Sequence, residues 1–577
     1  MTFMSVVTGS HTSPLPTWPQ RFFFFREKEN RRSGLWKGQE IVMMWCGSLS
    51  LAQGPAFNMR LGHCRRLCSR AEAPQNLGDG DSYFAKKNTK KVVVVGSGWA
   101  GLGAAHHLCN QGFDVTVLDD GRGGLNTPDD VGIQGFWYPY RNIFSLVDEL
   151  GVKPFTSWTT SAQYSVEGLE VEFPVFRELP QLPTPLGTLY YTQFARLPLM
   201  DKISSLPLMA AAIDFDNTDA AWRKYDPVTA RELLKQLGCS KRLYRDIFRP
   251  LLQVGLFAPP EQCSAAAMLA LLYYVTLSHQ KDFNMVWCRG TVQEKIFEPW
   301  MESLKDRGCR FLRNKSVTDF TINEESGSVT EVVCGRDTYA ADAVILAVTI
   351  SALQETVKKS AALCKREEFL KVLNLTAIDV VSVKLKLDRK VAIPHASNAC
   401  SAPDESYGWT FFDLSAIYDE HREDEVTVVR ADFYHGNELM GTTDEVAVTK
   451  TMSYLSKCVK GFENAVVVDA DVQRFPHSLS HFFPGSYKYM MRGSTSFPNM
   501  FMAGDWVITR HGSWSQEKSY VTGLEATNRV VDFLGEGSFA KVIPIEGDEP
   551  HVEALRTLNR RFHELASQLP LSSYFLQ

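Results

Sequence analysis

A run of β-branched residues that leads directly into a glycine motif is the feature that most constrains the fold of this chain. Val92–Val95 has the continuous apolar composition of a strand buried on both faces of a parallel sheet. A helix is predicted over Leu102–Gln111 and a second strand over Phe113–Leu118. Strand, glycine turn, helix and strand in this order predict an α/β fold with a dinucleotide site at the turn. The motif has the spacing G-x-G-x-x-G and consists of Gly96, Gly98 and Gly101.

Each position of the motif has a separate mechanical role. Gly96 makes the tight turn, Gly98 lets a pyrophosphate approach the backbone, and Gly101 lets the helix pack closely against the strand. The start of the helix, which includes Trp99 and Ala100, offers N–H groups and a positive dipole to the phosphates.

An acidic residue ends the predicted second strand. Asp119 follows the motif after roughly 20 residues, where a carboxylate accepts hydrogen bonds from the adenosine ribose hydroxyls. Its neighbour Asp120 is the alternative for this role. The motif is preceded by a predicted strand, followed by a predicted helix and then by an acidic residue at the end of the next strand. This context makes the prediction of a dinucleotide site specific, whereas the glycines alone would not.

A second glycine turn lies near the other end of the chain, in the segment Phe501–Thr527. There an apolar run ends at Gly504-Asp505, and a loop then leads into a helix-like segment. This is again the profile of a loop that holds a ligand. We therefore expect a long dinucleotide, anchored at one end by each glycine turn, which favours FAD over NAD.

Composition narrows the functional class. The chain has 577 residues, is 44% hydrophobic and carries a net charge of −5, so it has no electrostatic footprint for nucleic acid. Its longest uncharged apolar run in the body, Ala265–Leu277, is shorter than the roughly 20 residues that span a bilayer. It is predicted to be a buried helix; a lining for a greasy substrate tunnel or a membrane-dipping face is the alternative.

The cysteines and the N-terminal residues give information about the cellular compartment of the protein. The 12 cysteines include no Cys-x-x-Cys pair, which predicts reduced thiols and neither a metal site nor a disulfide framework. Ile41–Ala71 contains arginines and no acidic residue, as in an organelle transit peptide, although an ordinary N-terminal tail is the alternative. Translation is predicted to start near Met43 or Met44, with the preceding residues an extension of the gene model.

Three segments resemble the superfamily of FAD-dependent amine oxidases and phytoene desaturases, which includes carotenoid desaturases and isomerases, in its plant plastid form. They are Val92–Asp119, Trp287–Val348 and Phe501–Thr527. The middle segment contains a predicted hairpin around "NEESGS" and a predicted strand at Ala343–Val348; Arg289-Gly290 replaces the family's Gly-Gly. The resemblance implies a Rossmann-like, GR2-type FAD-binding domain interleaved with a mixed α+β substrate domain.

The domain boundaries follow from where the three segments lie. Residues 1–90 are predicted to be the leader and 536–577 a C-terminal surface tail with a helix. The FAD-binding domain is predicted over 91–150, 282–350 and 483–535, and the substrate domain over 151–281 and 351–482.

The resemblance also implies roles at the cofactor. Asp505 would contact the ribityl or pyrophosphate part of FAD, and the backbone of Val317 the adenine. Gly523 would let the helix around Tyr520–Arg529 approach the pyrimidine edge of the flavin. The family's Gly-Gly-Arg turn has lost its arginine here, so Arg122 is the substitute expected at the pyrophosphate. FAD is expected to bind non-covalently, because the C-terminal flavin segment contains no cysteine.

Flavin catalysis asks little of side chains, because the isoalloxazine ring itself takes the hydride or electrons. The candidates beside the ring are His511 and the tryptophans Trp506 and Trp514, with Lys384 or Lys386 as a possible analogue of the amine-oxidase lysine. Thr522 replaces a glutamate that relatives often carry before Gly523.

The leading functional prediction is an FAD-dependent oxidoreductase in a plastid, acting on a hydrophobic, carotenoid-like or isoprenoid substrate by hydride or electron transfer. Quinone or O2 would accept the electrons, and peripheral membrane contact is possible. A flavin amine oxidase that forms imine and peroxide is the second prediction. A non-redox binding protein of the GDP-dissociation-inhibitor type is the third, which Asp119 and Ala503-Gly504-Asp505 disfavour.

Overall fold

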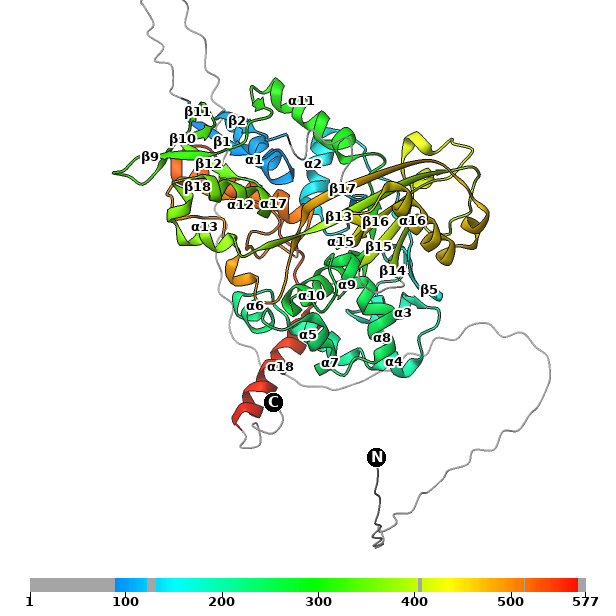
Figure 1. Ribbon diagram of the computed structural model, residues 1–577. Helices are drawn as coiled ribbons and strands as arrows, with labels where there is room; N and C mark the ends of the chain where they lie inside the picture. The colour runs from blue at the N-terminus through cyan, green and yellow to red at the C-terminus, as the bar shows by residue number, and fades with distance from the viewer. Residues whose placement is uncertain (1–88, 122–130, 278, 403–406, 513, 569–577) are drawn as a thin grey trace, which may run out of the picture. The chain divides into compact units, whose positions relative to one another are not determined.

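The computed structural model describes residues 89–121, 131–277, 279–402, 407–512 and 514–568 (Figure 1). These residues belong to one unit, Ala85–Gln577. The predicted leader, its suggested start at Met43 or Met44, and Arg122 lie outside the described residues.

The nucleotide sheet is assembled from strands that lie far apart in the sequence. Its order is β18-β12-β1-β2-β8 and every neighbouring pair is parallel. The strands predicted at Val92–Val95, Phe113–Leu118 and Ala343–Val348 are confirmed, with ends that differ by one or two residues. The five strands are β1 (Lys91–Val95), β2 (Asp114–Leu118), β8 (Arg310–Leu312), β12 (Ala343–Leu346) and β18 (Met500–Met502).

Helices cover one face of this sheet and a hairpin layer the other. The first face carries α1 (Trp99–Asn110), α2 (Arg141–Leu150), α11 (Glu298–Asp306) and α17 (Gln516–Leu534). On the other side the predicted hairpin is confirmed as part of the antiparallel sheet β9 (Asp319–Ile322), β10 (Val329–Cys334) and β11 (Asp337–Ala340). The same layer contains α12 (Ile350–Lys359) and α13 (Glu367–Val372).

The second large sheet joins the two segments that were predicted to form the substrate domain. Its order is β17-β13-β16-β15-β14-β4-β5-β6, and the parallel pair β14–β4 is the junction between the segments. The first segment supplies β4 (Ser161–Ser165), β5 (Gly168–Phe173) and β6 (Gln193–Phe194). The second supplies β13 (Thr376–Leu387), β14 (Ser397–Ser401), β15 (Gly408–Asp413), β16 (Val428–Tyr434) and β17 (Val467–His481).

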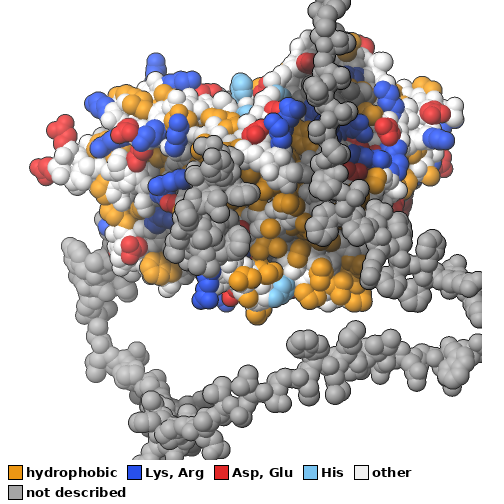
Figure 2. All heavy atoms as spheres, turned by 90° about the horizontal axis from the view of Figure 1, so that it is seen from below, with side chains coloured by type: hydrophobic (Ala, Val, Ile, Leu, Met, Phe, Trp, Pro, Cys, Tyr) orange, Lys and Arg blue, Asp and Glu red, His pale blue; other side chains and the backbone are white. Residues whose placement is uncertain are grey.

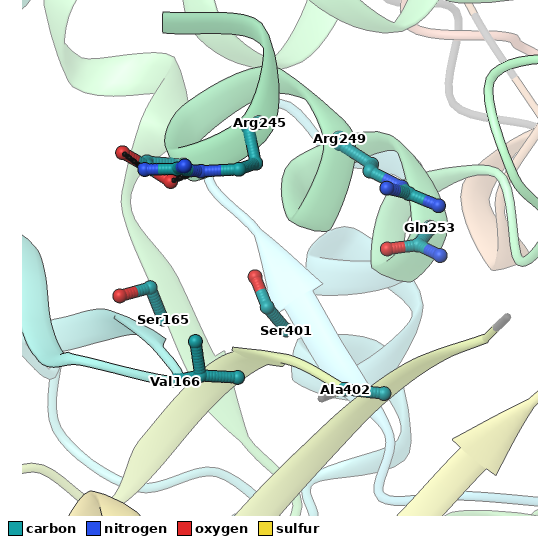
Figure 3. Close-up of a pocket in the computed structure, with 8 residues that line it drawn as sticks. Ser165, Val166, Arg245, Arg249, Gln253, Ser401 and Ala402 are labelled. Atoms are coloured by element: carbon teal, nitrogen blue, oxygen red, sulfur yellow. Dashed lines mark hydrogen bonds and ion pairs between the residues drawn. The ribbon is translucent and has the colours of Figure 1, made fainter. Parts of the chain in front are cut away.

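A small cavity of about 50 Å³ lies between this sheet and α9 (Arg249–Gly255). Ser165 and Ser401 face it from the strands, and Arg249 and Gln253 from the helix (Figure 3). α9 packs directly on β15, because a Cβ added at Gly408 would lie 2.5 Å from the Cβ of Gln253. The cavity has room for one or two water molecules, not for a substrate.

The remaining helices form a layer beside the second sheet. They include α3 (Leu186–Tyr191), α4 (Leu199–Ile203), α5 (Leu206–Asp214) and α10 (Ala265–Leu271). Every residue of α10 is buried, which confirms the buried helix predicted there and removes this helix from any membrane-dipping face. Among the described residues, no helix has the length and apolarity needed to cross a bilayer. The C-terminal helix predicted in the tail is α18 (Pro550–Gln568).

The helices α3, α4 and α5 expose large apolar side chains, and we call the surface that they form the apolar face. Tyr190, Leu199 and Met200 are exposed by 76%, 70% and 74%. Figure 2, which views the molecule from the side of α4, α5 and α18, shows hydrophobic side chains gathered on that face. We define the apolar face as the exposed large apolar residues of the stretch from α3 to α5, namely Leu186, Leu189, Tyr190, Leu199, Met200, Ile203 and Leu206.

Candidate functional site

The glycine turn after β1 contains two tightly packed glycines and one open one. A Cβ added at Gly96 would lie 2.1 Å from the carbonyl oxygen of Ala347, and one added at Gly101 would lie 1.9 Å from that of Gly96. Gly96 also has a φ of +108°, which disfavours any residue with a side chain. At Gly98 an added Cβ would meet nothing within 4 Å. The backbone at Gly98 therefore offers an approachable surface, as the sequence predicted for the pyrophosphate.

The start of α1 is bare of side chains that could compete with an anion. α1 begins at Trp99, three residues before the predicted start, so that the first turn lies inside the motif. Gly98 is its N-cap; no side chain caps it, and its first turn holds no acidic residue. The N–H groups and the positive end of the dipole are therefore directed at whatever lies beside Gly98.

Asp119 is buried at the end of β2 with its carboxylate held in place. It accepts hydrogen bonds from the hydroxyl of Ser97 and from the backbone N–H of Gly121, the latter at 2.7 Å. A carboxylate has lone pairs for about four hydrogen bonds, so these two are compatible with further donors from a ribose.

The second glycine turn meets the first through α17. A Cβ added at Gly523 would lie 2.2 Å from the carbonyl oxygen of Ala100, so α17 crosses the start of α1 at backbone contact. The Thr522 hydroxyl accepts from the N–H of Gly504 at 2.9 Å and donates to the Ser519 carbonyl at 2.8 Å. Thr522, noted as a departure from relatives, thus ties the helix to the turn after β18.

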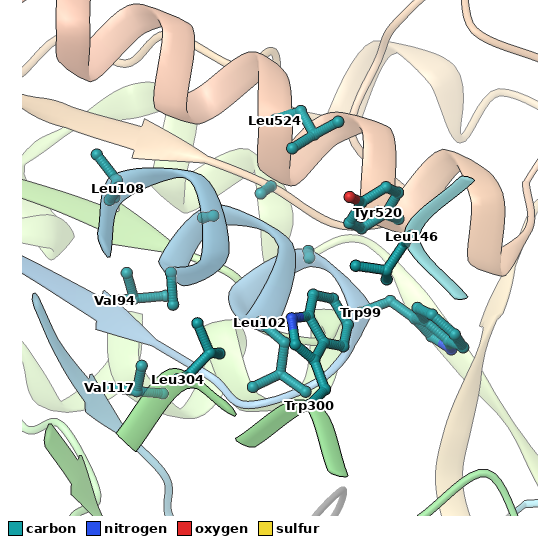
Figure 4. Packing of buried hydrophobic residues seen from close by; sticks show 14 of the residues in the cluster. Val94, Trp99, Leu102, Leu108, Val117, Leu146, Trp300, Leu304, Tyr520 and Leu524 are labelled. Carbon is teal, nitrogen blue, oxygen red and sulfur yellow. The ribbon is translucent and has the colours of Figure 1, made fainter. Parts of the chain in front are cut away.

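Side chains from several elements fill the space around this crossing (Figure 4). Leu102 and Trp99 from α1 and Trp300 from α11 pack in one buried cluster with Tyr520 and Leu524 from α17. The ring centroids of Trp300 and Tyr520 are 5.9 Å apart. The two helix ends are consequently fixed relative to each other and to β1.

Two ionisable groups at the second turn, Asp505 and Lys518, influence each other electrostatically. Burial raises the pKa of the Asp505 carboxyl, while the nearby Lys518 ammonium and the Ser480 hydroxyl act against that rise. Lys518 is only 6% exposed, and burial lowers the pKa of its ammonium to about 8 against the opposing pull of Asp505 and Glu525.

Glu517, the residue before Lys518, points the other way. Its carboxylate accepts from the N–H of Asn142 at 2.9 Å, from the Asn142 side chain at 2.7 Å and from the N–H of Ile143 at 3.0 Å. It therefore caps the first turn of α2. Sequence reasoning missed both Glu517 and Lys518. The signal was the adjacent pair of charges two and three residues after the capping serine Ser515, in a helix start otherwise expected to face a cofactor.

The residues predicted as catalytic candidates lie in ion pairs or in the core. The His511 Nε2 lies 3.6 Å from the Glu517 carboxylate, and Lys384 forms an ion pair with Glu420 at 3.7 Å. Trp506 is fully buried in the core and donates to the carbonyl of Val348 at 3.0 Å.

Trp514 is the candidate that joins an aromatic cluster beside the second large sheet. Its ring packs edge-on against Phe257 at 4.6 Å, and Phe257 also contacts Tyr434 of β16 at 5.0 Å. Among the described residues its indole N–H is buried and has no hydrogen-bond partner. Val317, predicted to contact adenine, is buried in the core beside the β9–β11 sheet, and its assignment remains a prediction.

A parallel sheet with a glycine turn after its first strand, combined with a second large sheet from the intervening segments, is typical of Rossmann-like, FAD-dependent oxidoreductases. The chain belongs to the family of flavin-containing amine oxidoreductases, whose family model matches residues 99–531.

Curated relatives are similar along most of their length. The chain is 22% identical to the 15-cis-phytoene desaturase of Synechococcus elongatus over 468 residues, covering 76% of this chain and 96% of the relative. It is 21% identical to the chloroplastic/chromoplastic 15-cis-phytoene desaturase of Arabidopsis thaliana, covering 76% and 80%. Among solved structures, cyclohexylamine oxidase from Brevibacterium oxydans has a TM-score of 0.59 at 13% identity, covering 78% and 100%. That likeness shows the fold.

FAD is the cofactor of this family, and the protein is an FAD-dependent oxidoreductase. The residues present fit FAD. The open surface at Gly98 and the bare start of α1 suit the phosphates, the fixed Asp119 carboxylate suits a ribose, and the Gly504-Asp505 turn suits a second polar segment. Individual contacts of these residues with FAD remain predictions.

Proposed function

We propose that the protein oxidises or isomerises a hydrophobic, isoprenoid-type substrate of the carotenoid class. The observation that carries this proposal is the similarity over nearly the whole length of cyanobacterial phytoene and zeta-carotene desaturases. When bound, FAD supplies the acceptor for a hydride or electrons. The chain's own residues then have to bind an apolar molecule, orient it and exclude water.

The aromatic cluster that includes Trp514 suits that task. Phe257, Tyr434 and Trp514 come from the helical layer, from the substrate-domain sheet and from the loop between Asp505 and α17. An apolar wall beside the flavin segment would accept a polyene and shield the reacting C–H from water.

The apolar face supports a membrane source for the substrate. Contiguous exposed apolar side chains are a marker of membrane or protein contact. Insertion of Leu199, Met200 and Tyr190 into a lipid surface would bury them, and the ammonium of Lys202 on the same helix would remain at headgroup level. We therefore propose peripheral membrane binding through α3–α5, with a lipid-soluble quinone as the electron acceptor.

One assay separates this proposal from the amine-oxidase alternative. Protein starting near Asp81 and loaded with FAD is given 15-cis-phytoene or zeta-carotene in liposomes with a soluble quinone analogue. We expect substrate loss, with a product of longer conjugation or changed geometry on chromatography. Peroxide formed from cyclohexylamine or putrescine and O2, with no change in either carotene, would overturn the proposal in favour of an amine oxidase.

The membrane part has its own matched pair of variants. Met200→Asp on the apolar face should weaken liposome co-sedimentation at least tenfold and lower carotene turnover in parallel. Val468→Asp, at a side chain 60% exposed on β17, should leave both unchanged. Equal liposome binding by both variants would refute the apolar face as the contact.

We further propose a plastid location, supported by the arginine-bearing leader and by the chloroplastic plant relatives. A fluorescent protein fused after a leader that starts at Met44 should accumulate in plastids. A fusion that stays in the cytosol would refute the proposal.

A further inference from the structure

The Lys518 ammonium is a feature of the second turn that neither packing nor capping explains. The residue is buried, with only 6% of its surface exposed. In the part of the chain that the structure describes, no hydrogen bond or ion pair is formed by its Nζ; the charges of Asp505 and Glu525 favour its ammonium form and partly oppose the fall of its pKa. Burying an ammonium without a close partner is costly, and an apolar side chain of the same length would fill the space without that cost.

The backbone of Lys518 is fixed at the end of α17 that meets α1. Its N–H donates to the Ser515 hydroxyl at 3.1 Å, which places it in the capped first turn. One turn further on, Gly523 is in backbone contact with Ala100 in the first turn of α1. Lys518 therefore belongs to a rigid helix end beside the cofactor loops, and its surplus charge acts together with the positive end of the α17 dipole.

The chemistry of an ammonium limits what it can face. It only donates hydrogen bonds, so it suits acceptor atoms and negative charge. The phosphates of a dinucleotide already have the glycine turn and the bare start of α1, and a hydroxyl-bearing chain is suited by the Asp505 carboxylate. The remaining acceptors on FAD are the carbonyl oxygens and ring nitrogens of the pyrimidine edge, where negative charge accumulates on reduction.

We propose that Lys518 faces the pyrimidine edge of FAD and raises the reduction potential of the flavin. It acts as a tuning residue that stabilises the reduced cofactor over the oxidised one. This inference rests on the family cofactor and not on the substrate class, so it stands or falls independently of the proposed carotenoid activity.

The test is the midpoint potential of bound FAD, measured by equilibrium titration without substrate, together with the dissociation constant of oxidised FAD. Lys518→Met removes the charge at nearly constant length. We expect the preference for reduced over oxidised FAD to fall at least tenfold, which for a two-electron couple lowers the potential by about 30 mV. Lys518→Arg should restore most of the shift. Lys305→Met, at an exposed position on α11, is the control and should not move the potential.

The outcomes distinguish the positions that Lys518 could take. Weaker binding of oxidised FAD with an unchanged potential would place the ammonium at the phosphates and overturn the proposal. A raised potential in Lys518→Met would overturn it as well. Lys518→Gln, which keeps a donor but no charge, should give the same fall as Lys518→Met; it serves if the methionine variant does not fold.

Discussion

The helix starts of α1 and α17 meet at one crossing but are built in opposite ways. α1 begins at a glycine, has no capping side chain and no acidic residue in its first turn. α17 begins at Ser515, which caps it, and its first turn carries the buried charges of Glu517 and Lys518. The start of α1 exposes its backbone because no side chain caps it, whereas the start of α17 has a capping serine and two charged side chains. The start of α1 offers backbone N–H groups, which suit any phosphate, whereas the start of α17 adds two charged side chains.

The largest effect is expected from a substitution that forces the starts of α1 and α17 apart. In Gly523→Ala the new methyl group would lie 2.2 Å from the Ala100 carbonyl oxygen, a backbone atom that cannot move aside alone. We expect a loss of about 3 kcal/mol in the free energy of unfolding, typical of overpacking, and loss of bound FAD on gel filtration. Gly441→Ala, where an added Cβ meets nothing within 4 Å, is the control and should stay within about 0.5 kcal/mol. Full FAD occupancy in Gly523→Ala would show that the contact is not needed.

The next largest effect concerns the charge that α17 buries. Burial lowers the pKa of the Lys518 ammonium to about 8, so the folded, FAD-free protein releases this proton at a lower pH than the unfolded chain does. Between pH 8 and the unfolded value near 10.5, the unfolded chain binds a proton that the folded one releases, so this group makes the protein more stable as pH rises. FAD-free Lys518→Met should therefore exceed wild type by up to about 3 kcal/mol at pH 6, and the gap should close above pH 10. A gap that does not change with pH in urea titrations would contradict the burial of the ammonium.

Glu517 offers a contrast within the same turn, because it serves α2 and not the cofactor. Glu517→Gln keeps the shape but turns one oxygen into a donor that faces the N–H groups of Asn142 and Ile143. We expect a loss of about 2 kcal/mol in the free energy of unfolding, with the FAD potential unchanged. Glu553→Gln, in the first turn of α18, is the matched control. A shifted potential in Glu517→Gln would mean that the two neighbours do not have separate roles.

Local patterns could be predicted from the sequence, and long-range ones could not. β1, the glycine turn and β2 lie within about 30 residues, and each has a strong local signal in β-branched runs and glycine spacing. The pairing of β14 with β4 joins residues such as Ser397 and Ser161, and no short pattern records that register. The sequence therefore predicted a substrate domain in two pieces, but not that they form one sheet.

The same reason explains which site residues were missed. A lysine in a helix is exposed by default, so its charge draws no attention in the sequence; only the fold shows that Lys518 is enclosed. The Thr522 hydroxyl could be flagged as a departure from relatives, but its bonds to the Gly504 turn depend on how α17 packs.

The smallest effect on folding is expected from a substitution at the start of α1, which tests directly whether this helix start binds the phosphates. In Gly98→Ala the added methyl group meets no protein atom within 4 Å, so the free energy of unfolding without FAD should change by less than about 0.5 kcal/mol. The methyl group would nevertheless stand where the pyrophosphate approaches the backbone, so FAD affinity should fall at least tenfold. Calorimetry of FAD binding and urea unfolding of the FAD-free protein measure the two effects separately. Gly98→Ala that binds FAD as wild type does would mean that the phosphates do not lie at this turn, and the open surface beside Gly98 would then lose its assigned role.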